Sequence, residues 1–232
     1  MFSFTEQRLL WLNAVKLSSV KLNRDVVAKA GLNLLNEVGL AGLTMRLLAK
    51  ELGVTAAAIY GHVKDKQALL DAMATQMFVE VAEQMEAPRQ GVGWQDWMAD
   101  RMRVYRRTML RYRDGGRVMA GTFIDHPAFH RAGELTLRTL QDAGLDRHAM
   151  RATAPLLHYV IGFTIEQQAQ SGVDYPDGNP YQDGRFEGTV DAERFPLFAE
   201  AVQGIVGWDP DEDFEYGMAV ILRGITATVS NS

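Results

Sequence analysis

The chain has 232 residues, enough for one small module and a larger body with its own core. Hydrophobic residues make up 47% and charged residues 23%, the ordinary mixture of a folded soluble protein. No stretch approaches the roughly 20 apolar residues of a membrane span. Because there is no cysteine, disulfide bonds and thiolate metal sites are excluded, which agrees with a reducing, cytoplasmic location.

Charge is distributed unevenly along the chain. Residues 1–66 carry nine Lys and Arg against five Asp and Glu, whereas the remainder carries 15 against 24. Such asymmetry is expected where one end of a protein meets nucleic-acid phosphates and the rest does not. A chance fluctuation over a short segment would give the same balance, so charge alone leaves both interpretations open.

Residues 1–20 resemble no secretory signal. The longest apolar run there, at 9–12, has four residues, and no small-residue cleavage site follows it. We expect a helical extension or a mobile arm in this segment.

The first strong helical pattern follows Asn23, a favourable N-cap residue, and continues through Val38. Gly39 and Gly42 are expected to end this helix. A second, short helix follows a cap at Thr44.

The second helix is expected to stop at Gly53, and Thr55 then caps a third helix from Ala56 to about Val63. Asp65 caps a long fourth helix, whose apolar residues continue to residue 82. The prolines and glycines of residues 88–93 break the chain after it.

Beyond residue 90, helical periodicity predicts five further helices, at about 94–113, 127–143, 147–171, 190–205 and 211–229. The tract at about 172–188 has the composition of a mobile loop, with two prolines, four glycines and four acidic residues. No segment alternates with period two between turns. The sequence therefore predicts an all-α fold.

The second and third helices have the spacing of a helix-turn-helix, which lays its second helix in the major groove of DNA. The residues left to face DNA are Thr44, Arg46, Thr55, Ala56, Ala57, Ala58, Tyr60, Gly61, His62 and Lys66. Arg46 is the best candidate for a bidentate contact with guanine, whereas Tyr60 and His62 can reach phosphates. Many proteins that do not bind DNA also contain two short helices and a glycine turn, so spacing alone leaves the function open.

The residues themselves carry a resemblance. The segments LLNEVG, GLT-R-LA--LGV, IY-HV-K-K and ALLDA resemble the TetR family of bacterial repressors, in its tetracycline-repressor branch, densely over residues 23–78. Thinner landmarks follow in the same order, at residues 94–97, 112–115, 121–122 and 162–166.

The resemblance implies three parts: an N-terminal extension at 1–20, a helix-turn-helix DNA-binding domain at 21–66, and a helical ligand-binding and dimerisation domain at 67–232. It also implies a homodimeric repressor on a palindromic operator, with the two DNA-binding domains in successive major grooves about 34 Å apart.

In the family, the last two long helices form the dimer interface, here at 147–171 and 211–229. The apolar stripes that would serve it are Met150, Ala154, Leu157, Ile161 and Ile165 on the first helix, and Phe214, Met218, Ile221, Leu222 and Ile225 on the second. Such stripes occur more often in plain core, so the dimer is implied mainly by the resemblance.

The resemblance also places a small-molecule effector inside the larger domain. The residues that would line its site are Met77, Val81, Arg101, Tyr105, Met119, Thr122, Leu135, Leu157, His158, Ile161 and Glu166. Most of them are apolar or aromatic, and a few polar groups would orient the ligand. Any one of them could equally be ordinary core.

The tetracycline branch binds a drug–magnesium chelate through a histidine just before the Gly-Thr landmark, where this chain has Met119. A second histidine of that site is matched by Ala82, and an asparagine by Arg101. Glu166 remains, but one carboxylate does not make a magnesium site. We therefore expect a largely apolar or aromatic effector other than tetracycline–magnesium, and no cofactor.

Three rival interpretations are weaker. His126 and His130 could share a helix face and hold a metal, but Pro127 indicates a helix start there, and no third ligand is in view. An enzyme would need a nucleophile with its base or a metal, and the neighbouring pair Asp125 and His126 supplies neither. A ligand-binding or interaction module with little operator specificity is supported only by the alanine-rich helix at 56–63.

Overall fold

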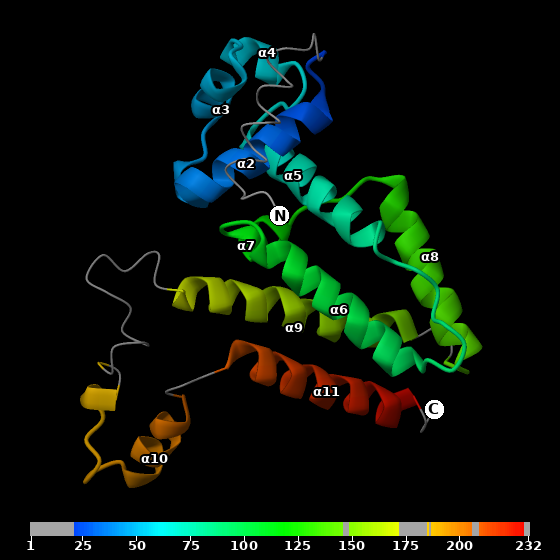
Figure 1. The fold of residues 1–232 in the computed structure, drawn as a ribbon, viewed down its shortest axis with the longest axis vertical. Coiled ribbons are helices and arrows are strands. Elements are labelled where there is room, and N and C mark those ends of the chain that lie inside the picture. Colours follow the sequence, from blue (N-terminus) through cyan, green and yellow to red (C-terminus); the bar gives the residue numbers. More distant parts are fainter. Residues whose placement is uncertain (1–20, 146–148, 172–184, 186, 206–208, 230–232) are drawn as a thin grey trace.

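The computed structural model describes residues 21–145, 149–171, 185, 187–205 and 209–229. Within these ranges the chain is helical and contains no strand, as expected for an all-α protein (Figure 1). The extension predicted at 1–20 and most of the loop predicted at 172–188 lie outside the described residues. None of the described helices is both long enough and apolar enough to cross a membrane.

The first part of the chain contains α2 (Arg24–Gly42), α3 (Met45–Leu52), α4 (Ala56–Tyr60) and the start of α5 (Lys66–Ala82). Asn23, Thr44, Thr55 and Asp65 precede these four helices. In each, a side-chain oxygen accepts the backbone N–H three residues later, at 2.7 to 3.2 Å. These bonds satisfy donors that the first helical turn leaves free, and they confirm the predicted helix starts.

The small three-helix unit is closed by apolar contacts between α3 and α4. Leu48 and Ile59 are fully buried, and Ala49 is 4% exposed where the two helices approach each other. Helix α4 ends at Tyr60, three residues before the predicted end. The next residue, Gly61, has a low helix propensity, and the chain turns there although Val63 is buried.

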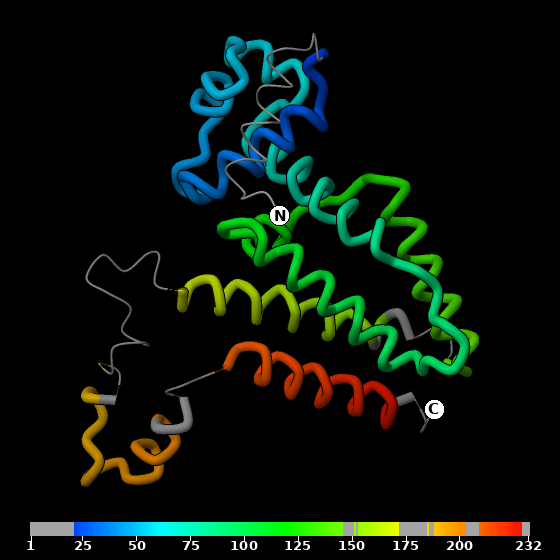
Figure 2. Tube along the Cα trace, viewed as in Figure 1, coloured from blue at the N-terminus to red at the C-terminus, as the bar shows by residue number. Residues whose placement is uncertain are grey.

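Helix α5 connects the two parts of the molecule without a break (Figures 1 and 2). Its first turns pack against α2, where the Gln76 amide donates to Asp25 at 3.2 Å. Its last turns pack against α6 (Trp94–Leu110) and α8 (Pro127–Asp142). There the ring of Phe78 lies 5.2 Å from that of Phe129 and 6.0 Å from that of Tyr105.

In the larger part, α6 and α7 (Gly115–Met119) lie against α9 (Ala149–Gln170), and α11 (Pro210–Val229) runs antiparallel beside α9 (Figure 2). Helices α9 and α11 are joined by aromatic rings: Tyr159 stacks on Phe214 with centroids 5.7 Å apart, and Phe163 packs edge-on against Phe214 at 5.4 Å. The short turn η1 (Glu187–Thr189) precedes α10 (Pro196–Ile205).

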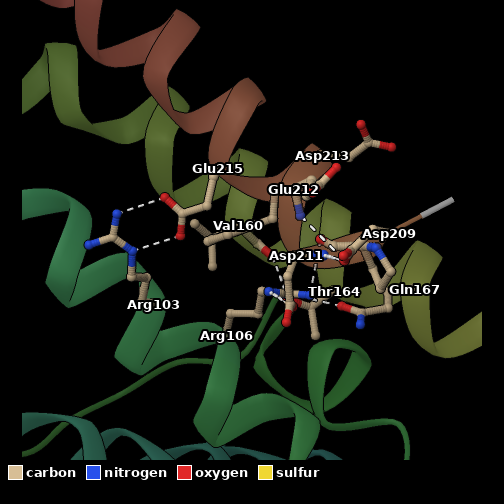
Figure 3. A network of polar contacts seen from close by, with 12 residues as sticks. Arg103, Arg106, Val160, Thr164, Gln167, Asp209, Asp211, Glu212, Asp213 and Glu215 are labelled. Atoms are coloured by element: carbon tan, nitrogen blue, oxygen red, sulfur yellow. Dashed lines mark hydrogen bonds and ion pairs between the residues drawn. The ribbon is translucent and has the colours of Figure 1, made fainter.

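Two arginines of α6 fasten α11 and α9 to this layer (Figure 3). Arg103 forms an ion pair with Glu215 at 2.6 Å, and this hydrogen-bonded carboxylate raises the pKa of the guanidinium. Arg106 pairs with Asp211 at 2.7 Å and donates to the Gln167 amide oxygen at 3.0 Å. The Arg106 side chain is 9% exposed but that of Asp211 is 81% exposed, so solvent still screens this pair from the Asp211 side.

Some boundaries differ from the sequence prediction. Helix α6 ends at residue 110 rather than 113, because the chain turns sharply before the unpredicted α7. At Gly115, the first residue of α7, a Cβ atom would collide with the carbonyl oxygen of Met109, so this position admits only glycine. Helix α10 begins at Pro196 rather than at residue 190, since proline is favoured in a first helical turn.

The turn between α6 and α7, residues 111–114, binds the N-terminal unit. Asp114 accepts the backbone N–H of Leu40 at 2.7 Å, and the backbone N–H of Arg113 donates to Asn36 at 2.7 Å. Leu40 follows Gly39, whose φ of 66° breaks the helical geometry of α2 and turns the chain toward Asp114. The predicted helix end at Gly39 is thus a kink inside α2, and this kink brings the Leu40 N–H to the Asp114 carboxylate.

The same turn also binds α5 and α9. The Tyr112 hydroxyl donates to Glu80 of α5 at 2.6 Å, and burial, together with this carboxylate, raises the pKa of Tyr112. Gln168 of α9 donates to the Tyr112 carbonyl at 2.8 Å and accepts the Gly116 N–H at 3.0 Å. The α6–α7 turn therefore joins α2, α5 and α9 at one point.

We predict that Asp114→Ala lowers the free energy of unfolding by about 2–4 kcal/mol, because it removes a charge-assisted hydrogen bond and leaves a non-glycine residue at a positive φ. Asp114→Asn should lose much less, since asparagine tolerates this conformation and can still accept the Leu40 N–H. Urea unfolding at one fixed protein concentration measures both. Equal stabilities for the two variants would contradict the role given to the side chain.

Candidate nucleic-acid interface and effector site

The helix-turn-helix presents most of its predicted DNA-facing residues to solvent. Arg46 on α3 is exposed, and so are Tyr60 and His62 at the end of α4. The exposed residues among the others are Thr44, Thr55, Ala57, Gly61 and Lys66, and the half-buried ones are Ala56 and Ala58. The small side chains of α4 let its backbone approach another surface closely.

Thr44 and Thr55 already use their hydroxyl oxygens as helix caps, which fixes the first turns of α3 and α4. The side chain of Lys66 also has a partner within the chain, because its Nζ donates a hydrogen bond to the Leu40 carbonyl at 3.1 Å. Lys50 and Lys64 are exposed in the same unit but were not among the predicted residues. Their signal was the excess of basic residues within residues 1–66.

The predicted effector-site residues come from α5 to α9 and are buried to different degrees. The buried ones are Met77, Val81, Arg101, Tyr105 and Met119; the partly buried ones are Thr122, Leu135, Leu157 and Ile161; the exposed ones are His158 and Glu166. The structure thus places most of this set inside the larger part, and two members on an outer face of α9.

Arg101 is unusual among these residues because a guanidinium lies inside an apolar layer. Its side chain lies over the ring of Trp97, 4.2 Å from the ring centroid, and its Nη2 lies 2.9 Å from the sulfur of Met85. Within the described part of the chain, its Nε and Nη1 atoms have no hydrogen-bond partner. Burial lowers the pKa of Arg101 to about 10, so the group remains a cation at neutral pH.

Tyr105 lies one helical turn further along α6, and burial raises the pKa of its phenol to about 12. It is therefore a neutral hydroxyl at physiological pH. Its ring packs edge-on against Phe78, which in turn contacts Phe129 of α8. Helices α5, α6 and α8 thus share an aromatic cluster next to the buried guanidinium.

The residues that would hold a metal chelate do not gather here. Met119, in the place of the expected histidine, is 8% exposed and offers a thioether, a poor ligand for magnesium. His126 caps α8, with its Nδ1 accepting the Ala128 N–H at 3.1 Å, so the helix starts at Pro127 as predicted. Across the described ranges, no group of three or more His, Asp or Glu side chains is placed to hold a metal ion.

Helices α9 and α11 each have an inner and an outer face. On α11, the predicted interface residues Phe214, Met218, Leu222 and Ile225 are 0–7% exposed within the single subunit, so they belong to its own core. The outward residues of the two helices, at helical spacing, are Ala154, His158, Gly162 and Glu166 on α9, and Tyr216, Val220 and Gly224 on α11.

Two family models cover this architecture. The model of the bacterial regulatory proteins, tetR family, matches residues 27–73, and the tetracyclin repressor-like, C-terminal domain matches residues 87–229. The chain belongs to the TetR family of bacterial regulatory proteins. The resemblance inferred from the sequence motifs is thereby confirmed.

Individual relatives agree with this membership. The chain is 37% identical over 207 residues to the tetracycline repressor protein class A from transposon 1721 of Escherichia coli, covering 88% of this chain and 91% of the relative. A possible TetR family transcriptional regulator from Streptomyces coelicolor A3(2) has a TM-score of 0.77 at 33% identity, covering 89% of this chain and all of the other.

A further solved structure is that of the Streptomyces coelicolor TetR family protein ActR in complex with actinorhodin. It has a TM-score of 0.74 at 26% identity, and covers 90% of this chain and 98% of ActR. This TetR-family chain is therefore a regulator of transcription and not an enzyme. It binds operator DNA as a homodimer, and a small molecule bound in its C-terminal domain releases it.

We predict that Arg46→Ala weakens binding to an operator selected from random duplexes by about 1–3 kcal/mol and relaxes the preference at one base pair, since a bidentate contact with guanine would be lost. The matched control is Arg107→Ala, an equal loss of charge at an exposed site on α6. Fluorescence anisotropy at fixed salt measures both affinities. An Arg46 variant that binds and discriminates as the Arg107 variant does would refute the assignment.

Proposed function

We propose that this TetR-family regulator is a cytoplasmic repressor that binds a palindromic operator and is released by a largely apolar or aromatic effector other than a tetracycline–magnesium chelate. Residues 21–66 are its DNA-binding domain, and residues 67–232 its ligand-binding and dimerisation domain. The observation that carries the proposal is a capped, solvent-facing helix-turn-helix joined by one continuous helix, α5, to a body with apolar and aromatic residues at the expected effector positions.

Recognition of DNA is assigned to α3 and α4. Arg46 would contact base edges, Tyr60 and His62 phosphates, and the alanines of α4 the thymine methyl groups. Two such units related by the dimer axis would occupy successive major grooves, about 34 Å apart. Lys64, exposed at the end of α4, is added as a further phosphate contact.

An effector other than tetracycline–magnesium is supported by the side chains at three positions. Met119 stands where a metal-binding histidine would be needed, the Ala82 side chain has no polar atom, and Arg101 brings a cation that repels a bound metal ion. The solved complex of ActR with actinorhodin illustrates that related folds accept other effectors.

Release would act through the two connections between effector site and DNA-binding domain. Helix α5 carries Met77 and Val81 toward one end, and its N-cap Asp65, which follows the helix-turn-helix in the chain, at the other. The α6–α7 turn follows the helix that bears Arg101 and contacts α2 through Asp114. An effector that binds one separation of the two DNA-binding domains more tightly than another shifts the dimer away from its operator.

The salt dependence of operator binding tests this function. We expect log K to fall steeply with log [salt], with a loss of about 10³–10⁵ in affinity between 50 and 200 mM for about 6–10 phosphate contacts. The selected operator should bind at least about 10³-fold more tightly than a scrambled duplex. The alternative, a ligand-binding module with little operator specificity, predicts equal affinities for both duplexes.

Dimerisation is assigned to the outward faces of α9 and α11. Val220 is 48% exposed in the single subunit, and Val220→Glu would bring two carboxylates into the proposed interface. We expect this variant to be monomeric by analytical ultracentrifugation and to lose about half the salt slope, because only one DNA-binding domain binds. Leu137→Glu, at a 37% exposed site on α8, is the matched control and should stay dimeric. A dimeric Val220 variant would exclude this face.

A further inference from the structure

Arg101 is a buried cation for which the described residues provide no negatively charged partner. It is 7% exposed, and two of its nitrogens, Nε and Nη1, lack a hydrogen-bond acceptor in the described part of the chain. Among the described residues, it contacts the face of Trp97 and the Met85 sulfur and interacts with the phenol of Tyr105, and none of these groups is negatively charged at neutral pH. Removing a charge from water without a counter-ion is among the costlier arrangements in a protein, so an unpaired one calls for an explanation.

The other arginines of the same helix show that the fold can supply partners. Arg103 is paired with Glu215, and Arg106 with Asp211 and Gln167. Both point toward α11 or α9, where acidic and amide side chains are in reach (Figure 3). Arg101, on the same helix, has no carboxylate or amide partner among the described residues, so an anion bound to it would come from outside this part of the chain.

The surroundings of Arg101 define what such an anion would look like. Trp97 and Tyr105 lie one turn before and one turn after Arg101 on α6. The guanidinium lies 4.2 Å from the centroid of the Trp97 ring and interacts electrostatically with Tyr105. Phe78 extends this apolar surface toward α8, and the neutral phenol of Tyr105 is a possible hydrogen-bond donor. These groups match a flat, apolar molecule that carries one acidic substituent.

We propose that Arg101 is the specificity-determining residue of the effector site, and that it selects an aromatic effector bearing a carboxylate or an ionised phenol. This inference rests on the proposed function, in which a small molecule binds inside the C-terminal domain. The anion accepts hydrogen bonds from the free guanidinium nitrogens and supplies the counter-charge that the subunit lacks. The buried cation destabilises the free protein, and binding of the anion removes that penalty.

The test uses pairs of probes that have one shape and different charge. Anthracene-2-carboxylate and anthracene-2-carboxamide share their rings, and the second is neutral. Isothermal titration calorimetry on the full-length dimer should show the carboxylate binding about 10–100-fold more tightly, the range of a charge-assisted hydrogen bond. Quenching of tryptophan fluorescence gives a second, optical signal, to which Trp97, in contact with Arg101, contributes together with the other three tryptophans. Benzoate and 2-naphthoate, each with its amide, extend the comparison to smaller rings.

Variants assign the preference to Arg101. Arg101→Gln and Arg101→Met should bind the carboxylate and the carboxamide with affinities within about threefold of each other, whereas Arg101→Lys should keep part of the preference. Arg107→Gln removes an exposed charge one and a half turns away on the same helix and should behave as the wild-type protein. A preference that survives in Arg101→Met would overturn the assignment.

Stability separates a ligand-selecting role from a structural one. If the charge of Arg101 is neutralised only when an effector binds, Arg101→Met should raise the melting temperature of the unliganded dimer by about 2–4 °C. The substitution replaces a buried unpaired charge with an apolar side chain of similar length. A fall of several degrees would show a structural residue and overturn the inference.

The outcomes also distinguish this inference from the function on which it rests. A wild-type protein that binds acid and amide equally, or binds neither, refutes the anionic effector. Operator affinity and its salt dependence are measured without any of these probes, so they test the proposed repressor function independently of the anionic effector.

Discussion

The carboxylate of Asp114 and the backbone N–H of Leu40, 74 residues apart in sequence, form the contact on which the arrangement of the two domains depends. It lies at the α6–α7 turn, which also binds Glu80 of α5 and Gln168 of α9. Because the bond is short and charge-assisted, α2 cannot tilt relative to α6 without losing it. The DNA-binding domain is therefore held at two places, by this turn and by the uninterrupted α5.

This double attachment explains how a ligand far from DNA can act on it. A single flexible linker would let the two domains move independently, so a conformational change in one would not be transmitted to the other. Here, a displacement of α5 or α6 has to be accommodated by α2, by α9 or by both, since all of them meet at residues 111–114. The ion pairs that Arg103 and Arg106 of α6 form with α11 connect this outer helix to the same set of contacts (Figure 3).

Local chemistry made much of this predictable from the sequence. The caps at Asn23, Thr44, Thr55 and Asp65 act within three residues, so each start could be located without knowing the fold. What depends on tertiary contact could not be found in this way. Helix α7 was missed because its two glycines have a low helix propensity and are required by packing alone. The stripe on α11 was assigned to the dimer interface mainly from the family resemblance, because periodicity cannot distinguish a core inside one subunit from a core between two. The unpaired state of Arg101 was likewise invisible, since it depends on what the other helices fail to bring near it.

The intolerance of Gly115 to any side chain has an evolutionary consequence. The Met109 carbonyl occupies the space that a Cβ atom at residue 115 would need. Any other residue at this position would therefore disrupt the turn that connects the domains. Arg101 lies two and a half turns upstream on α6 and makes none of the contacts of that turn. A substitution at Arg101 can therefore change the proposed effector preference while the far end of α6 keeps its contacts with α2, α5 and α9. A lineage built on this scaffold can change what it senses faster than how it responds.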